Sequence, residues 1–151
     1  MAKTTLTLMV GLPRSGKSTW IKENKTDEIV IEQDWIRTNV FGHQFHGPAE
    51  PFLFAVVSAM IRTLINQGKD VILDATCLTK DIRNRYIRIA EESNSNIKIV
   101  WLCTHIDTCC DRNESSPKGQ QVPRDLLRAM NIRLEKPMKH EYNELVIVEE
   151  N

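Results

Sequence analysis

The stretch GLPRSGKST, Gly11–Thr19, decides the fold of this chain. Gly11, Gly16, Lys17 and Ser18 fit the pattern G-x-x-x-x-G-K-S/T, which follows the β-rich run TLTLMV and precedes a predicted helix. The glycines let backbone N–H groups turn toward a phosphate, and the N-terminus of the helix adds positive potential. The stretch therefore predicts a loop between a strand and a helix that holds the phosphates of a nucleotide.

The predicted nucleotide-binding residues lie in this loop and directly after it. Lys17 is expected to reach the β- and γ-phosphates, and the Ser18 hydroxyl is expected to ligate Mg²⁺. The predicted cofactors are therefore ATP or GTP together with Mg²⁺. The other predicted contacts to the nucleotide are Gly11, Pro13, Arg14, Ser15, Gly16 and Thr19.

The rest of the chain alternates between strand and helix patterns. This alternation predicts an α/β fold with a mainly parallel sheet of four to five strands and helices on both faces. Ligands of such sheets bind beyond the carboxyl ends of the strands. With 151 residues, we expect one domain over 1–151. The predicted strands are 5–10, 28–32, 70–74, 97–103 and 145–148. The first predicted helix starts at about 17, and the others cover about 34–40, 51–67, 79–93, 107–113 and 124–134.

Composition limits the partners of the chain. The 20 basic and 20 acidic residues balance, so no overall electrostatic field draws the chain to nucleic acid or to an anionic membrane. Any polyanion must therefore bind to a local basic patch. The longest apolar tract, 51–61, is well short of the roughly 20 residues that span a bilayer and predicts a buried helix. The four cysteines show no C-x-x-C spacing and suit reduced thiols, which predicts a cytoplasmic protein without a membrane partner.

A carboxylate and a guanidinium follow the second predicted strand. Asp34 and Arg37 are one helical turn apart, so both side chains are expected to face the same cleft. Asp34 is suited to accept the proton of an attacking hydroxyl, and Arg37 is suited to hold an acceptor phosphate. The same spacing is typical of an aspartate that caps a helix beside a solvated arginine, and the residues alone leave both interpretations open.

Several motifs occur together in a fixed order. From about Leu6 to Pro137 the chain resembles the kinase domain of phage polynucleotide kinases, a group of P-loop phosphotransferases. The resemblance implies a P-loop kinase-type fold and transfer of the γ-phosphate of a nucleoside triphosphate to a 5′-hydroxyl end of RNA or DNA. The motifs that carry it are GLPRSGKSTW, D-x-x-R at 34–37, VILDATCLT at 71–79, RN at 112–113, VPRDLLRAM at 122–130 and LEKP at 134–137.

The resemblance also implies roles for individual residues. Lys17 and Ser18 would bind ATP and the metal ion. Asp34 would be the general base toward the 5′-hydroxyl, and Arg37 would contact the acceptor. Asp74, which follows the third predicted strand, would support the acceptor site.

A lid at about 112–123 would close over the phosphates. Arg112 stands at its start and Lys118 stands where the family carries an arginine, and the sequence leaves open which of the two contacts the phosphates. Arg14 stands where many relatives carry a small residue and is expected to face solvent. The D-x-D-x-T/V motif of the 3′-phosphatase that often accompanies this kinase is missing from the sequence, so 3′-end healing is not expected.

The segment after the second predicted strand is rich in aromatic and histidine side chains. His43 and His46 have a metal-like spacing, but no cysteine or carboxylate partner is near in the sequence, so a zinc site is not expected. Trp35, Phe41 and Phe45 are candidates to stack on an acceptor base, and core packing is the expectation for at least one of them.

Three function classes follow from these residues. The first is a polynucleotide 5′-hydroxyl kinase. The second is a kinase of a small alcohol such as a nucleoside, sugar or antibiotic, and the third is a nucleotide-binding module without phosphate transfer. Asp34 on the γ-phosphate side argues against the third class, and the resemblance favours the first class over the second.

Overall fold

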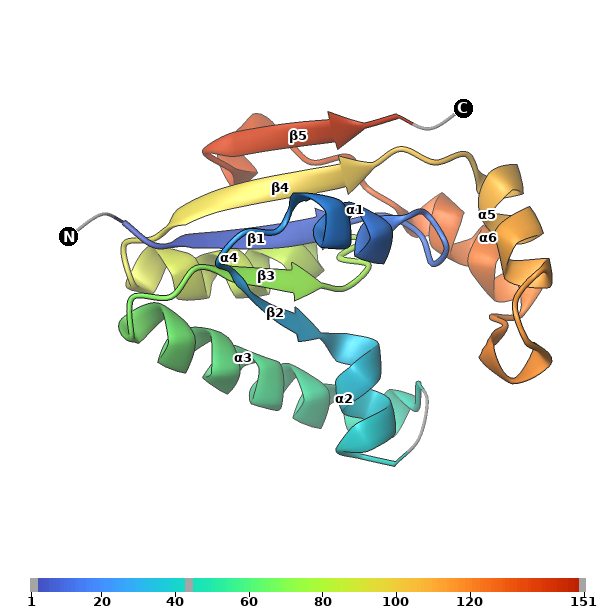
Figure 1. Cartoon of the computed structure of the whole chain (residues 1–151), viewed down its shortest axis with the longest axis horizontal. Helices are drawn as coiled ribbons and strands as arrows, with labels where there is room; N and C mark the ends of the chain where they lie inside the picture. Colours follow the sequence, from blue (N-terminus) through green and yellow to red (C-terminus); the bar gives the residue numbers. More distant parts are fainter. Residues whose placement is uncertain (1–2, 43–44, 150–151) are drawn as a thin grey trace.

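The computed structural model describes residues 3–42 and 45–149 and contains one five-stranded sheet. The strand order is β2-β3-β1-β4-β5, and every neighbouring pair is parallel, as Figure 1 shows. This confirms the predicted parallel sheet. The strands are β1 Thr5–Val10, β2 Ile29–Glu32, β3 Val71–Asp74, β4 Asn96–Leu102 and β5 Glu144–Val148.

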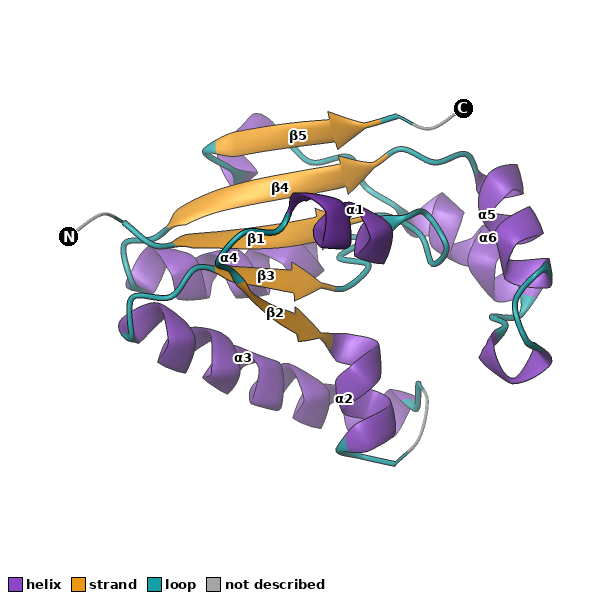
Figure 2. Ribbon diagram, viewed as in Figure 1, coloured by secondary structure: helices purple, strands orange, loops and turns teal. Residues whose placement is uncertain are grey.

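Helices connect the strands (Figure 2), and each helix end that was predicted lies within one residue of the observed one. Local signals explain this agreement. Gly68, which follows the third helix, has a left-handed φ of +78° that suits a helix end, and Thr79 caps the fourth helix by accepting a hydrogen bond from the backbone N–H of Ile82. The helices are α1 Lys17–Asn24, α2 Gln33–Asn39, α3 Glu50–Asn66, α4 Lys80–Glu92, α5 Ile106–Glu114 and α6 Arg124–Arg133, with short 3-10 turns at Gly47–Ala49, Lys118–Gln120 and Lys139–Glu141.

The sheet is covered on both faces, because successive side chains of a strand point in opposite directions. In β1, Leu6 and Leu8 pack in the same cluster as the buried sides of α3 and α4. Met9 points to the other face and packs with Ile21 of α1. Figure 1 shows α1 and α4 on opposite sides of the sheet. The prediction of helices on both faces is therefore confirmed.

Helix α3 carries the longest apolar tract of the chain. By length and composition alone, the stretch Gly47–Asn66 is the single helical stretch among the described residues that would suffice to cross a membrane. Four buried side chains at successive helical turns, Leu53, Val57, Ile61 and Ile65, pack in the main core cluster. This spacing is that of an amphipathic core helix, as the sequence predicted.

The carboxyl ends of the strands meet at one edge of the sheet. β1 ends at Val10, directly before the predicted phosphate loop, and β3 ends at Asp74. Glu32, the last residue of β2, pairs in register with Asp74. Asp34 lies two residues after Glu32 in the sequence, so Asp34 lies at the same edge of the sheet. The fold therefore gathers the predicted donor and acceptor residues at the edge where ligands of such sheets bind.

Candidate functional site

The phosphate loop between β1 and α1 is held in shape by the neighbouring strands. The N–H of Gly11 donates to the carbonyl of Thr76 after β3 (3.1 Å), and the hydroxyl of Thr104 after β4 donates to the carbonyl of Ser15 (2.7 Å). A Cβ at Gly11 would lie 2.6 Å from Ser15 Oγ and 3.2 Å from Leu102 Cβ, which explains the glycine. The phosphate loop is thus attached by hydrogen bonds to the segments that follow β3 and β4 at the edge of the sheet.

Lys17, the first residue of α1, folds back over this loop. Its Nζ donates to the carbonyls of Gly11 (3.1 Å) and Leu12 (2.7 Å). Burial lowers the pKa of Lys17, and the negative charges of Asp74 and Asp34 oppose that shift. The ammonium group therefore lies at the loop within the field of two carboxylates that come from different strand ends.

Ser18 and Asp74 form the second polar contact of the loop. The Ser18 hydroxyl donates to Asp74 Oδ2 over 2.7 Å, and Asp74 is only 8% exposed. Burial raises the pKa of Asp74, while the Ser18 hydrogen bond and Lys17 act in the opposite direction. The fold thus places Asp74 against the predicted metal-binding hydroxyl.

A hydroxyl and a carboxylate oxygen at this distance suit Mg²⁺, which takes few protein ligands and keeps water and phosphate oxygens. Within 3–42 and 45–149, no group of three or more histidine, cysteine or acidic side chains is arranged to hold a metal ion by itself. The pair Ser18 and Asp74 therefore fits a Mg²⁺ ion that is shared with a nucleotide. Of the two predicted histidines, His46 is exposed and His43 lies outside the described residues.

The predicted acceptor pair is present, and a third residue completes it. Arg37 Nη1 donates to Asp34 Oδ1 over 2.5 Å. The other side of the guanidinium meets Glu50, the first residue of α3, with Nε to Oε2 at 3.0 Å and Nη2 to Oε1 at 2.6 Å. Burial opposes the charge of Arg37, but Glu50 and Asp34 outweigh burial and raise the pKa of Arg37. The carboxylates of Asp34 and Glu50 therefore accept hydrogen bonds from Nε, Nη1 and Nη2 of the Arg37 guanidinium.

The alternative in which Asp34 caps a helix is wrong. Helix α2 begins at Gln33, its N-cap residue is Glu32, and no side chain caps it. Asp34 lies in the first turn with 87% of its side chain exposed, while Arg37 is 15% exposed. The Asp34 carboxylate is thus open to solvent on the side that Arg37 leaves free.

The aromatic side chains near Arg37 divide into two kinds. Phe41 packs against the main core cluster, which confirms the expected core packing for one of the three. Trp35 is 56% exposed and Phe45 is 67% exposed, and the Arg37 guanidinium carbon lies 5.8 Å from the centre of the Phe45 ring. Phe52 on α3, which the sequence did not single out, is also exposed.

The predicted lid segment is joined to the phosphate loop by Arg14 and Arg112. Arg112 Nη1 donates to the carbonyl of Arg14 over 3.2 Å, and Arg14 Nη2 donates to the carbonyl of Gln120 over 2.7 Å. Arg14 has a left-handed φ of +67°, and its hydrogen bond to Gln120 shows that its side chain reaches the lid segment and is not simply solvent-facing. Lys118 is exposed on a short 3-10 turn. Of the two lid cations, Arg112 is therefore the one in contact with the loop.

The side chain of Asn113 links the two ends of this segment. The buried Asn113 amide donates to the carbonyl of Val122 over 2.7 Å and accepts from the Val122 N–H over 2.9 Å. Both ends of the segment are therefore fixed to each other, while in its middle the carbonyl of Gln120 accepts a hydrogen bond from Arg14 of the phosphate loop.

Comparison with known protein families matches most of the chain. A family model described as AAA domain covers residues 6–137. The chain belongs to this AAA domain family. The sheet order and the phosphate loop agree with a P-loop kinase-like fold. A comparison with curated protein sequences finds no significant match.

Solved structures show the same fold as this AAA domain. Kti12 of Chaetomium thermophilum, in complex with ADP-AlF3, superposes with a TM-score of 0.74 at 16% identity over 95% of this chain and 88% of its own. A chain of the Pnkp1/Rnl/Hen1 RNA repair complex gives 0.72 at 19% identity over 89% of this chain. APS kinase CysC of Mycobacterium tuberculosis, with AMPPNP and APS, gives 0.67 at 17% identity over 97% and 90%. The chain spans 45% of the length of the RNA repair protein.

Proposed function

We propose that the chain transfers the γ-phosphate of ATP or GTP to an alcohol, and that the alcohol is the 5′-hydroxyl end of RNA or DNA. The observation that carries this proposal is the position of Asp34 opposite the phosphate loop. Asp34 follows the end of β2, where Glu32 pairs in register with Asp74, and its charge acts on the pKa of both Lys17 and Asp74, which supports a place for its carboxylate near the phosphate loop. A nucleotide-binding module without transfer has no need of this carboxylate.

On the donor side, the loop N–H groups and Lys17 would hold the β- and γ-phosphates. Ser18 Oγ and Asp74 would hold Mg²⁺, which when bound neutralises charge on the β- and γ-phosphate oxygens. The Ser18 hydroxyl already directs its proton to Asp74, which leaves its lone pairs for the metal. Arg112, which contacts the loop at Arg14, would supply the lid cation.

On the acceptor side, Asp34 would accept the proton of the 5′-hydroxyl as its oxygen attacks the γ-phosphorus. The bond from that phosphorus to the bridging oxygen breaks, and the nucleoside diphosphate leaves. Arg37 would contact the phosphate on the 3′ side of the reacting nucleoside, in exchange for Glu50. The exposed rings of Trp35 and Phe45 would offer stacking faces worth about 1–3 kcal/mol per base.

A small alcohol is the second candidate acceptor, and one contact favours it. Glu50 occupies the fork of Arg37 with two hydrogen bonds, so an uncharged acceptor would leave that pair undisturbed. In either case the free state of all four cysteines supports a cytoplasmic location.

Transfer of radiolabel from the γ-phosphate of ATP tests this proposal. The acceptors are 5′-hydroxyl RNA and DNA oligomers, nucleosides and sugars, each with Mg²⁺. We expect label on the oligomers that is removable by a phosphatase. Label on nucleosides or sugars alone would replace the proposal by the small-alcohol kinase. Binding of MgATP without label on any acceptor would leave only a nucleotide-binding module.

A further inference from the structure

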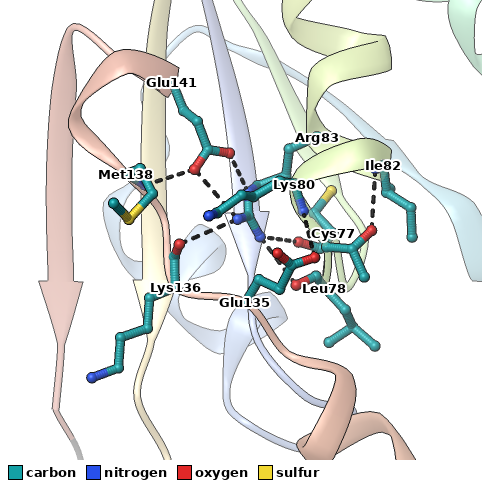
Figure 3. A network of polar contacts seen from close by, with 10 residues as sticks. Cys77, Leu78, Lys80, Ile82, Arg83, Glu135, Lys136, Met138 and Glu141 are labelled. Carbon is teal, nitrogen blue, oxygen red and sulfur yellow. Dashed lines mark hydrogen bonds and ion pairs between the residues drawn. The ribbon is translucent and has the colours of Figure 1, made fainter.

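A buried arginine lies behind the phosphate loop. Arg83 of α4 is 0% exposed, and Figure 3 shows its guanidinium between two segments of the chain. Its Nε donates to Glu141 Oε1 over 2.7 Å, and its Nη1 donates to the carbonyls of Cys77 (2.9 Å) and Leu78 (3.1 Å). Nη2 donates to Glu141 Oε2 (3.4 Å) and to the carbonyl of Lys136 (3.5 Å). A buried charge is tolerated only when it is paired this completely.

The two carbonyls on Nη1 belong to the loop that follows β3, residues 75–79. This loop continues directly from Asp74, and its Thr76 carbonyl accepts the hydrogen bond from the Gly11 N–H of the phosphate loop. Cys77 within it has a φ of +46°, a left-handed conformation that costs a residue other than glycine on the order of 1–3 kcal/mol. Such a conformation persists only when its surroundings impose it, and Arg83 binds the carbonyl of that same residue.

The opposite side of Arg83 is anchored by the segment between α6 and β5. Glu141 is 5% exposed, and its Oε2 also accepts from the backbone N–H of Met138 over 2.6 Å. The N–H of Glu135 donates to the carbonyl of Leu78 over 2.8 Å, beside the contact that Arg83 makes. The loop after β3 is thus clamped from two directions, and Arg83 is the side chain that joins them (Figure 3).

Stability alone does not account for this pair, because a buried ion pair replaced by apolar residues of similar volume often costs nothing. We propose that Arg83 is a positioning residue for phosphate transfer. It fixes the loop after β3, so that the Asp74 carboxylate meets Ser18 and the Thr76 carbonyl holds Gly11. Arg83 touches no reacting atom, and this role rests on the phosphotransferase function proposed above.

Two variants separate positioning from stability. Arg83→Lys keeps the charge, but an ammonium cannot reach the Glu141 carboxylate and two loop carbonyls with the geometry of a guanidinium fork. The double variant Arg83→Met/Glu141→Leu removes both charges and so avoids an unpaired buried charge. Ile61→Val in α3 is the matched control, since Ile61 is fully buried in the core cluster and the change costs about 0.5–1.5 kcal/mol.

The measurements are the melting temperature, the affinity for ATP with and without Mg²⁺, the half-saturating Mg²⁺ concentration and kcat, at a temperature where all variants are folded. We expect both Arg83 variants to need roughly tenfold more Mg²⁺ and to lose about 10²-fold in kcat, with ATP affinity in the absence of metal unchanged. Ile61→Val should lower the melting temperature and leave kcat and the Mg²⁺ requirement unchanged.

A folded Arg83 variant with wild-type Mg²⁺ dependence and kcat would overturn the inference. The inference would also be overturned if kcat fell in proportion to the melting temperature, and by the same proportion in the Arg83 variants and in the Ile61→Val control. If the wild-type chain transfers no phosphate, the proposed function fails by itself. The positioning role is then decided by the Mg²⁺ dependence of ATP binding, which must weaken in the Arg83 variants and not in the control.

Discussion

The donor side and the acceptor side of the site are built in different ways. On the donor side, the phosphate loop is fixed by hydrogen bonds to the Thr76 carbonyl after β3 and from the Thr104 hydroxyl after β4, and Ser18 is hydrogen-bonded to the buried Asp74. On the acceptor side, Asp34 is 87% exposed, and Arg37 is held by two carboxylates of its own chain. The proposed donor site is therefore already formed, whereas under the proposed function a substrate phosphate would have to replace Glu50 at the Arg37 guanidinium.

The two sides are therefore expected to respond differently to substitution. The loop is a continuous stretch of sequence between a strand and a helix, so few substitutions are compatible with it. The proposed acceptor residues lie on α2 and at the start of α3, where Asp34 is exposed and Arg37 is paired with Glu50. Changes in the phosphate-binding residues should therefore abolish transfer, whereas changes at Arg37 and Glu50 should alter which alcohol is used.

The largest effect is expected for Lys17→Ala on the donor side. Because Lys17 and the metal ion together neutralise the charge that develops on the phosphates, transfer should fall by about 10³-fold or more. Steady-state label transfer measures this. Lys22→Ala is the control, since Lys22 is exposed on the same helix and should keep wild-type turnover. Unchanged turnover in Lys17→Ala would refute the donor assignment.

Asp34→Asn should have the next largest effect. Without a proton acceptor at this position, kcat should fall by roughly 10²-fold. The melting temperature should stay within a few degrees, because a pair that involves so exposed a carboxylate adds little stability. Asp81→Asn, which changes an exposed aspartate in the first turn of α4, is the control and should be active. Full activity of Asp34→Asn would exclude it as the general base.

Glu50→Gln tests whether the acceptor side must exchange its own carboxylate. Glutamine removes the charge that competes for Arg37, so KM for an acceptor with a 3′-phosphate should fall by up to about tenfold. KM for the bare nucleoside should not change. Steady-state kinetics with both acceptors measure this, and Glu91→Gln on α4, an exposed glutamate, is the control. A higher KM for the phosphorylated acceptor would mean that Glu50 orients Arg37 and does not compete for it.

The smallest effect concerns stability at the donor side. The pKa of Asp74 in the folded chain lies above the ordinary value of 3.8, so ionisation of Asp74 disfavours the folded state. The contribution of Asp74 to the free energy of unfolding is therefore fully present below pH 3.8, and it is lost as the pH rises through the pKa that Asp74 has in the folded chain. Metal-free Asp74→Asn should therefore melt a few degrees above the wild type at pH 7, and this difference should vanish in acid. A lower melting temperature at pH 7 would show that Asp74 is stabilising in its charged form.

The regular part of the fold and the donor loop follow from local sequence. Strand and helix ends were predictable to within one residue, because apolar periodicity and capping residues such as Thr79 lie next to the ends that they set. The position of Asp74 against Ser18 needed the fold, because the two residues are 56 positions apart. A motif therefore predicts which residues act, and the fold determines which of them come into contact.

Glu50 and Arg83 were not predicted, for different physical reasons. Glu50 meets Arg37 only because α3 begins beside α2, and no pattern in the sequence marks that approach. Arg83 did leave a signal, since it stands on the apolar face of the predicted helix 79–93, three residues before Tyr86. A charge within such a face requires a buried partner, but Glu141 is 58 residues away and only the fold identifies it.

The central claim is that the donor site is preformed and that Arg37 of the acceptor site recognises a nucleic-acid phosphate. Acceptor selectivity tests this claim most directly. The measurement is kcat/KM for a nucleoside and for its 3′-monophosphate, on the wild type and on Arg37→Ala. A charge-assisted contact of about 1.5–3 kcal/mol predicts a preference of roughly ten- to a hundredfold for the 3′-monophosphate, and Arg37→Ala should remove most of it. Equal kcat/KM values for the two acceptors on the wild type would contradict the claim and assign the chain to the kinases of small alcohols.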